Sequence, residues 1–210
     1  MKMSSLFFII GIFTSSIINF MTMKLYTTLI FFAIFVTGLF AQSNKWTTLE
    51  ELTLTLPEHE ALALFEGEWD VQIEFFFDKD DGKALKGAGD SKNQVVLGGR
   101  FIESRSQNIA FGMSITSIAY LGYDVRLQKY TLYSMDELGN FAINAYGDFK
   151  KSESKFIFEG NTMDYVTRED QMFRIIYDFE GADLIKYEVD FLLPDGSYKP
   201  YINAEFRRKQ

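Results

Sequence analysis

The sequence predicts an all-β protein, an up-and-down antiparallel β-barrel of about ten strands that follows a short N-terminal helical cap. From residue 66 onward, apolar and polar residues alternate with a period of two, which is typical of strands with one buried face. Turns rich in Gly, Asn and Asp separate these segments, and no convincing helix lies between any two of them. Strands joined by short turns pair antiparallel, and closure of the sheet leaves no exposed edge.

The first segment, residues 1–41, is predicted to be a secretory signal peptide. Met23 and Lys24 precede an apolar run over residues 25–40, and the small residue Ala41 stands before a polar stretch. A second apolar run in residues 1–22 leaves two readings: a two-pass membrane hairpin, or a start assigned too early with Met23 as the first residue. Both runs are short for a span of roughly 20 residues, which favours the second reading. We therefore expect an exported protein, periplasmic or extracellular, with no stable membrane anchor after cleavage.

Residues 42–65 are predicted to form the helical cap. Pro57 fits the first turn of a helix, and Gly67 follows as a stop. Apolar residues at positions 61, 62, 64 and 65 make one stripe. Two capping boxes are predicted, Thr48 with Glu51 and Thr55 with Glu58.

The barrel itself is expected to span residues 66–210. Its first strand alternates Trp69, Val71, Ile73 and Phe75 with polar residues and ends at an acidic turn over residues 78–82. Each later strand ends at a Gly-, Asn- or Asp-containing turn. The ten predicted strands cover residues 69–77, 86–97, 100–110, 113–123, 128–135, 141–149, 155–159, 172–179, 184–192 and 198–208.

Composition excludes several classes of protein. The chain has 210 residues, with no Cys, one His, and 29 Asp and Glu against 21 Lys and Arg. A chain without cysteine has no disulfide scaffold, thiolate zinc site or iron-sulfur cluster. An acidic surface repels phosphate backbones, and no basic cluster interleaved with aromatics reverses this locally. We therefore expect no nucleic-acid partner.

Several short motifs carry a resemblance to a known family. They are Glu58-His59-Glu60 with Leu64, Gly67 and Trp69, then Leu97-Gly98-Gly99-Arg100-Phe101, then Gly122-Tyr123-Asp124 with Tyr130. On these motifs the chain resembles the bacterial domain-of-unknown-function family numbered 1579 over roughly residues 57–207. That family is similar to the calycins, which include lipocalins and fatty-acid-binding proteins, so the resemblance implies a calycin-like barrel and supplies no established reaction.

Gly67 and Trp69 also resemble the lipocalin Gly-x-Trp motif. In lipocalins the indole closes the barrel floor beneath an arginine from the last strand, and the resemblance gives Arg207 or Arg208 this role. A guanidinium stacked on an indole contributes roughly 0.5 to 2 kcal/mol. Trp69 is accordingly interpreted as a structural plug.

The first functional hypothesis is a lipocalin-like module that binds a small apolar or amphipathic ligand in its lumen. An enzyme that uses Arg100, Glu103 or Tyr123 in the same cavity, and an interaction protein with a filled barrel, are the alternatives. The oligomeric state stays open, as does the face of the third strand that lines the lumen. The expected lumen residues are Val71, Ile73, Phe75, Tyr130, Phe156, Ile175 and Tyr177. The candidate ligand-binding residues are Trp69, Phe75, Arg100, Glu103, Tyr123 and Tyr130.

Neither catalytic residues nor a metal or cofactor are predicted. His59 is interpreted as a surface or capping histidine, and no Gly-x-Ser-x-Gly elbow accompanies it for a hydrolase triad. Residues 60–210 hold no histidine that could serve as an axial haem ligand. The acidic turn over residues 78–82 lacks the closing glutamate of a calcium loop. Arg100 follows two glycines and is interpreted as holding a tight corner by bonds to carbonyl groups.

Overall fold

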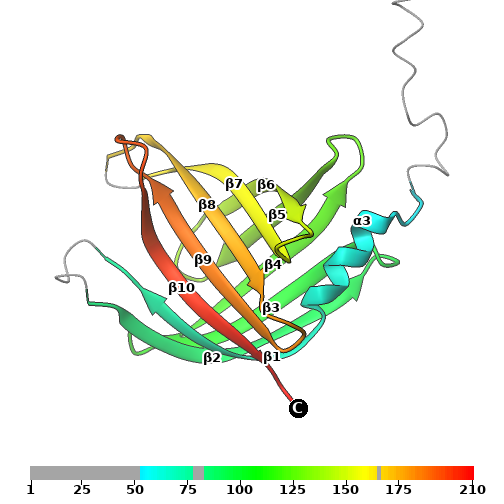
Figure 1. Ribbon diagram of the computed structural model, residues 1–210. Coiled ribbons are helices and arrows are strands. Elements are labelled where there is room, and N and C mark those ends of the chain that lie inside the picture. The colour runs from blue at the N-terminus through cyan, green and yellow to red at the C-terminus, as the bar shows by residue number, and fades with distance from the viewer. Residues whose placement is uncertain (1–52, 78–82, 165–166) are drawn as a thin grey trace, which may run out of the picture. The chain divides into compact units, whose positions relative to one another are not determined.

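The computed structural model describes residues 53–77, 83–164 and 167–210. Within them, ten antiparallel strands form a closed barrel in which each strand pairs with its neighbours in the chain, and β1 pairs with β10 (Figure 1). The predicted all-β, up-and-down barrel is confirmed. The strands are β1 (Gly67–Phe75), β2 (Leu85–Val96), β3 (Phe101–Ala110), β4 (Met113–Asp124), β5 (Lys129–Asp136), β6 (Ala142–Lys150), β7 (Lys155–Met163), β8 (Asp170–Phe179), β9 (Leu184–Leu192) and β10 (Tyr198–Arg208).

The predicted helical cap over residues 42–65 is interrupted, because residues 54–56 are not helical. The helical segment after them consists of α3 (Pro57–Glu60) followed by a 3-10 helix, η1 (Ala61–Phe65). A residue before proline is disfavoured from helical backbone, and Leu56 is extended with φ −103° and ψ 163°. The predicted Thr55 capping box is therefore wrong, because Leu56 is the N-cap and its N–H bonds the His59 side chain. The capping box at Thr48 lies outside the described residues, as do residues 1–41.

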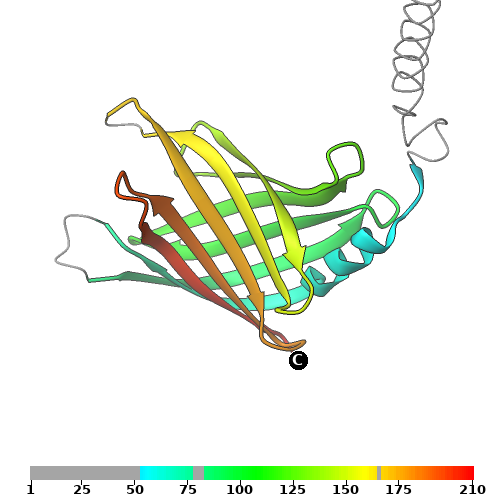
Figure 2. The ribbon, with the colours of Figure 1, turned by 45° about the horizontal axis from the view of Figure 1, so that its top comes forward.

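The helical segment covers one end of the barrel, which we call the capped end. Figures 1 and 2 show it beside the chain's C-terminus, near the start of β1. The opposite end, which we call the mouth, is where β1 ends and β10 begins. In the described ranges, no helix has the length and apolar character needed to span a membrane.

Strand β7 is longer than predicted, and a glycine explains why. Gly160 with Asn161 suggested a turn, but β7 runs on to Met163. A Cβ atom built on Gly160 would lie 2.4 Å from the Asn144 carbonyl oxygen and 2.6 Å from the Phe173 ring. The glycine therefore serves close packing inside the barrel rather than a change of direction.

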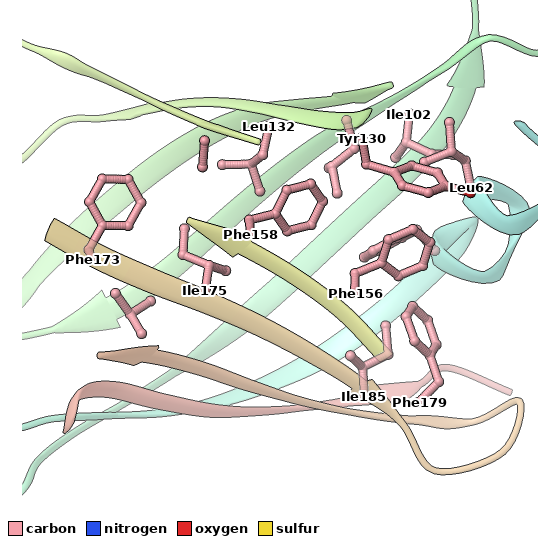
Figure 3. Close-up of a cluster of buried hydrophobic side chains, with 14 of the residues drawn as sticks. Leu62, Ile102, Tyr130, Leu132, Phe156, Phe158, Phe173, Ile175, Phe179 and Ile185 are labelled. Carbon is pink, nitrogen blue, oxygen red and sulfur yellow. The ribbon is translucent and has the colours of Figure 1, made fainter. Parts of the chain in front are cut away.

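Aromatic and aliphatic side chains fill the capped end. Phe156 and Phe158 of β7 point inward beside Leu62 of the helical segment and Ile175 of β8 (Figure 3). The Phe65 ring of η1 packs edge-on against Tyr177 and Phe179, with ring centroids 5.0 and 4.9 Å apart. The helical segment therefore contributes its apolar side chains to the barrel core and holds this end shut.

Trp69 lies in the same core and is 0% exposed. Its indole N–H donates to the Phe65 carbonyl oxygen at 3.0 Å, and Asn93 donates to the same oxygen at 2.9 Å. The guanidinium over its ring belongs to Arg208, whereas Arg207 extends outward to Glu205. Trp69 is thus the plug that the Gly-x-Trp resemblance implied, with Arg208 as its arginine.

Candidate ligand-binding lumen

The inner face of strands β2 to β5 carries small and polar side chains in a band that runs from the capped end at β2 toward the mouth at β5. Strand alternation places them on the same face as Trp69, Ile102, Leu121 and Leu132, which are buried in the core. The strand register aligns them in two adjacent rows that run around the barrel. One row is Ser91, Ser106, Ser117 and Asp136, and the other is Asn93, Ser104, Ala119 and Ser134.

The serines of these rows differ in their bonding. The Ser91 hydroxyl donates to the Asn93 amide oxygen at 3.0 Å and lies 3.4 Å from the Ser104 hydroxyl. Within the described ranges, no hydrogen bond joins the Ser106, Ser117 or Ser134 side chain to another residue, and each of the three is partly exposed. Residues that are partly exposed although strand alternation turns them inward are packed less tightly than Trp69 and Ile102, which are 0% exposed.

Asn108 of β3 supplies an acceptor on the same inner surface. Its side chain is 8% exposed, and its amide oxygen is buried without a hydrogen-bond partner among the described residues. That oxygen lies 2.7 Å from the position that a Cβ atom on Gly89 would take. The missing side chain at Gly89 thus leaves room for the Asn108 amide on the lumen side. A buried acceptor without a partner costs free energy, which a bound donor would recover.

Aromatic side chains on β8 and β9 complete the lumen. The Tyr177 and Tyr187 rings pack with centroids 4.8 Å apart. Burial raises the pKa of Tyr187, and the Asp136 carboxylate raises it further. Tyr177 also packs against Phe65 of the capped end, and Tyr187 packs edge-on against Phe206, with ring centroids 6.0 Å apart.

Large apolar side chains are exposed around the mouth. They lie at the ends of β2, β3, β4, β5, β7 and β8 and in two of the connecting turns. Other large apolar side chains are exposed away from the mouth, among them Leu97, Leu127 and Tyr146. The rim residues are Leu85, Ile109, Phe111, Met113, Met135, Leu138, Phe141, Met163 and Met172.

The apolar residues expected in the lumen do face inward, but at different depths. Val71, Ile73 and Phe75 share the inner face of β1, and Phe75 packs near the mouth with Ala110 and Ile115. Phe156, Ile175 and Tyr177 belong to the main hydrophobic core, which also includes Leu62 and Phe65 of the helical segment. Of the predicted ligand contacts, Phe75 is the one nearest the mouth.

Tyr123 and Tyr130 lie against the helical segment. The Tyr130 hydroxyl donates to the Glu58 carbonyl oxygen at 2.8 Å, and burial raises the pKa of Tyr130 to about 12. The Tyr123 ring packs edge-on against His59, with centroids 5.8 Å apart. Both tyrosines thus fasten α3 to the barrel, and their contact with a ligand stays a prediction.

Arg100 and Glu103 are not positioned to line the lumen. Arg100 donates through Nε to the Leu97 carbonyl oxygen at 2.9 Å, as expected of a residue that holds the corner. The turn before it needs left-handed backbone at three successive residues, with φ of 51°, 70° and 87° from Leu97 to Gly99. Glu103 projects from the outer face, where it accepts bonds of 2.7 Å from Arg105 and Tyr120. The expectation that Glu103 serves a cavity inside the barrel is therefore wrong.

His59 is a capping histidine, but a buried one. It is 4% exposed, and its Nδ1 accepts the Leu56 N–H at 2.9 Å. Burial lowers its pKa, so the neutral form is favoured. With Leu62 and Ile102 it lines a small apolar pocket of about 180 Å³ between the helical segment and the β2–β3 corner.

A second, larger hollow lies on the outside of the barrel. It has a volume of about 370 Å³ and is lined by charged residues of β1 to β3, including Glu68, Lys92 and Arg105. Two of them, Lys92 and Glu68, form an ion pair at 3.2 Å, and Lys209 pairs with Asp90 at its edge. Its charged side chains are paired with one another or, for Arg105, with Glu103, and Ser91 and Ser106 also belong to its lining.

Sequence reasoning missed the serine rows and Asn108. One signal was present in the sequence. Ser104, Ser106 and Asn108 follow Ile102 at every second position, so they share its face of the third strand. The register that aligns them with Ser91, Ser117 and Asp136 joins residues far apart in the chain. Periodicity within single strands does not contain that information.

Comparisons with known proteins place the fold. A family profile described as "Protein of unknown function (DUF1579)" matches residues 55–208. No curated protein matches the chain. The crystal structure of Rv2717c from M. tuberculosis is similar, with 14% identity, 75% of this chain and 100% of that chain covered, and a TM-score of 0.56. The S-type phycobiliprotein lyase CPES from Guillardia theta gives 8% identity, coverage of 78% and 99%, and a TM-score of 0.47. At such identities the likeness concerns the fold alone.

Proposed function

The chain belongs to the DUF1579 family, and from that premise we propose that its barrel binds a small apolar or amphipathic molecule in the lumen. One observation carries the proposal. Ser106, Ser117 and Ser134 are on the inner face of a closed barrel, yet the three residues are partly exposed and their side chains lack partners among the described residues. A barrel filled to the density of a protein core would bury them completely.

The rim supports the same function. Exposed side chains such as Phe111, Met113 and Phe141 surround the mouth. An apolar ligand that enters from solution would contact these side chains before it reaches the lumen. The inner face suits an amphipathic molecule, because serines line β2 to β5 while Tyr187 lies on the inner face of β9, on the other side of the closed barrel. Pockets for small molecules commonly combine apolar walls with a few polar groups.

A matched pair of substitutions on β3 tests the proposal. Ser106→Leu adds volume inside the barrel, and Gln107→Leu adds it on the outer face one residue further along the strand. If the lumen has space, Ser106→Leu leaves the free energy of unfolding almost unchanged and weakens binding of an apolar fluorescent probe at least tenfold. Gln107→Leu leaves probe binding unchanged.

A filled barrel predicts the opposite pattern. Extra methylene groups in a packed core cost about 1 to 3 kcal/mol, so Ser106→Leu would lower the urea midpoint clearly while neither the parent nor either variant bound the probe. That result would replace the ligand-binding proposal by the interaction-protein alternative. Mass spectrometry of the natively purified protein adds a direct search for a molecule that remains bound.

Export is the second part of the proposal. It rests on the basic start at Lys24, the apolar run after it and the small residue Ala41. Expression in a host that processes such leaders is expected to yield mature protein that begins at Gln42, measured by intact mass and N-terminal sequencing. Exported protein that retains residues 1–41 would contradict cleavage at this site.

A further inference from the structure

The charged side chains on the inner face of the barrel differ in whether other residues already occupy them. Among described inward-facing strand positions, Arg208, Asp136 and Lys199 are charged. Arg208 is engaged at the capped end, where it donates to the Glu66 and Ala182 carbonyl oxygens. Lys199 lies at the rim opposite Phe191 and has an interaction of its own. Asp136 is the charge beside the serine rows, since Ser117 is its register partner.

The uncharged polar groups of the lumen include an acceptor that needs a donor. The Asn108 amide oxygen is buried without a partner among the described residues, and Gly89 leaves the space beside it. The hydroxyls of Ser106 and Ser117 either donate or accept. A carboxylate in this region would face the Asn108 oxygen and the Asp136 charge, whereas the inward cation Lys199 is on β10 at the rim. A hydroxyl or ammonium group would donate to them.

The charged residues around the mouth are mainly acidic, so the electrostatic field there has the same sign as the charge of Asp136. The described turns and strand ends of the mouth carry more acidic than basic residues, so they attract cations and repel anions. This agrees with the net charge of −8 for the whole chain. The acids are Asp136, Glu137, Asp164, Glu169, Asp170 and Asp195, and the bases are Lys83, Arg168 and Lys199.

We propose that the lumen selects amphiphiles whose polar end is a neutral or cationic hydrogen-bond donor and discriminates against carboxylates, with Asn108 and Asp136 as the acceptors. This inference rests on the proposed function, because it names the chemical class of ligand for the same lumen. The polar end lies among the serine rows, and the alkyl part contacts Tyr187 and the apolar residues near the mouth.

Three amphiphiles of equal chain length test the selectivity. Decylamine, decanol and decanoate are titrated at pH 7 and low salt against a bound apolar fluorescent probe, below the concentrations at which they form micelles. We expect decylamine and decanol to displace the probe at concentrations at least tenfold lower than decanoate. Equal or tighter binding of decanoate overturns this inference and leaves the proposed function standing. Failure of all three, together with failure of the probe to bind, overturns the proposed function itself.

Two substitutions assign the selectivity to the lumen. Asp136→Asn keeps an oxygen for the bond from the Leu138 N–H, so the turn is preserved while the charge is removed. We expect the preference for decylamine over decanol to fall about tenfold, which corresponds to about 1.4 kcal/mol. Glu159→Gln makes the same charge change on the exposed outer side of β7 and is expected to leave the preference unchanged.

Asn108→Asp provides an independent readout in case Asp136→Asn folds poorly. It places a second carboxylate where the unpartnered oxygen now lies, so the preference for decylamine should rise and decanoate should bind more weakly still. Circular dichroism verifies that each variant retains its strands. If both folded lumen variants bind the three amphiphiles like the parent, or if Glu159→Gln shifts the preference equally, the assignment to Asn108 and Asp136 is overturned.

Discussion

The guanidinium carbon of Arg208 lies 4.1 Å from the centroid of the Trp69 ring. Trp69 is near the start of β1 and Arg208 is at the end of β10, and the two are register partners. The same guanidinium donates to the Glu66 carbonyl oxygen at 2.6 Å and to the Ala182 carbonyl oxygen at 2.8 Å. One side chain thus joins the first strand, the last strand and the β8–β9 turn at the capped end.

Arg208→Ala is expected to lower the free energy of unfolding by about 2 to 4 kcal/mol. It removes two charge-assisted hydrogen bonds and the contact with the Trp69 ring. Arg207→Ala is the matched control, because its exposed pair with Glu205 contributes little and a change within about 0.5 kcal/mol is expected. Urea unfolding followed by tryptophan fluorescence measures both, and equal losses would refute the role given to Arg208.

The stability of the protein is expected to fall as the pH decreases from about 6.5. Burial lowers the pKa of His59 below its ordinary value of 6.5, so the unfolded chain binds its proton more readily than the folded chain. The stabilisation is complete above the unfolded pKa and is lost as the pH drops through the folded pKa. His59 is the one histidine of the chain, which makes the range from pH 7.5 to 5 specific to it.

The control for this pH effect is His59→Asn, whose amide oxygen is a candidate to accept the Leu56 N–H. The variant has no imidazole, so its thermal midpoint should change much less between pH 7.5 and 5 than that of the parent. Parallel curves for parent and variant would show that another group titrates in this range.

Asp124 is expected to stabilise the β4–β5 turn. Its carboxylate accepts bonds from the Arg126 side chain and from the Arg126 and Leu127 N–H groups, and these bonds lower its pKa to about 2. Asp124→Ala should cost about 1 to 2 kcal/mol at pH 7. Because the folded pKa is lowered, the advantage over the variant should shrink as the pH falls from 3.8 toward 2, and chemical denaturation at both pH values measures it. An advantage that persists at pH 2 would contradict this account.

Phe75→Ala and Phe156→Ala are expected to differ in their effects on stability and probe binding, because Phe75 lies near the mouth and Phe156 in the packed core. Phe156 is 0% exposed and packs against Phe65, Tyr130 and Phe149, so its truncation should cost about 5 kcal/mol. Phe75 lies near the mouth, and its truncation should cost about 3 kcal/mol or less and change the affinity for an apolar probe. Urea unfolding and probe titration test both variants. Equal losses in the free energy of unfolding, with unchanged probe affinity, would contradict a difference in packing between the mouth and the capped end.

The strand pattern was predictable where one face of a strand is clearly apolar. In β1, Trp69, Val71 and Phe75 alternate with polar residues, and they are the buried positions. Strand β3 was ambiguous because Phe101 and Ile102 are adjacent and both apolar. Phe101 lies on the outer face over Gly122, where a Cβ atom would approach its ring to 2.4 Å. Because Phe101 is apolar but lies on the outer face, the sequence did not show whether Glu103 is on the inner or the outer face of the barrel.

The candidate site was less predictable than the fold. Aromatic residues attracted attention in the sequence, but Trp69 and Tyr130 serve the capped end of the barrel. The lumen surface near the mouth depends on Ser106, Ser117 and Asp136, which become neighbours only through strand pairing. Serine is common in turns and on surfaces, so its inward orientation had no separate signal in composition or periodicity.

The pairing of β1 with β10 also constrains how the chain folds. Trp69 and Arg208 are partners in the register although they are 139 residues apart, 208 minus 69, so the seam of the barrel closes only after almost the entire chain has been synthesised. Contacts of such long range slow folding, and until then both edge strands are exposed to other chains. Truncation before β10 should therefore yield an aggregating chain rather than a smaller barrel.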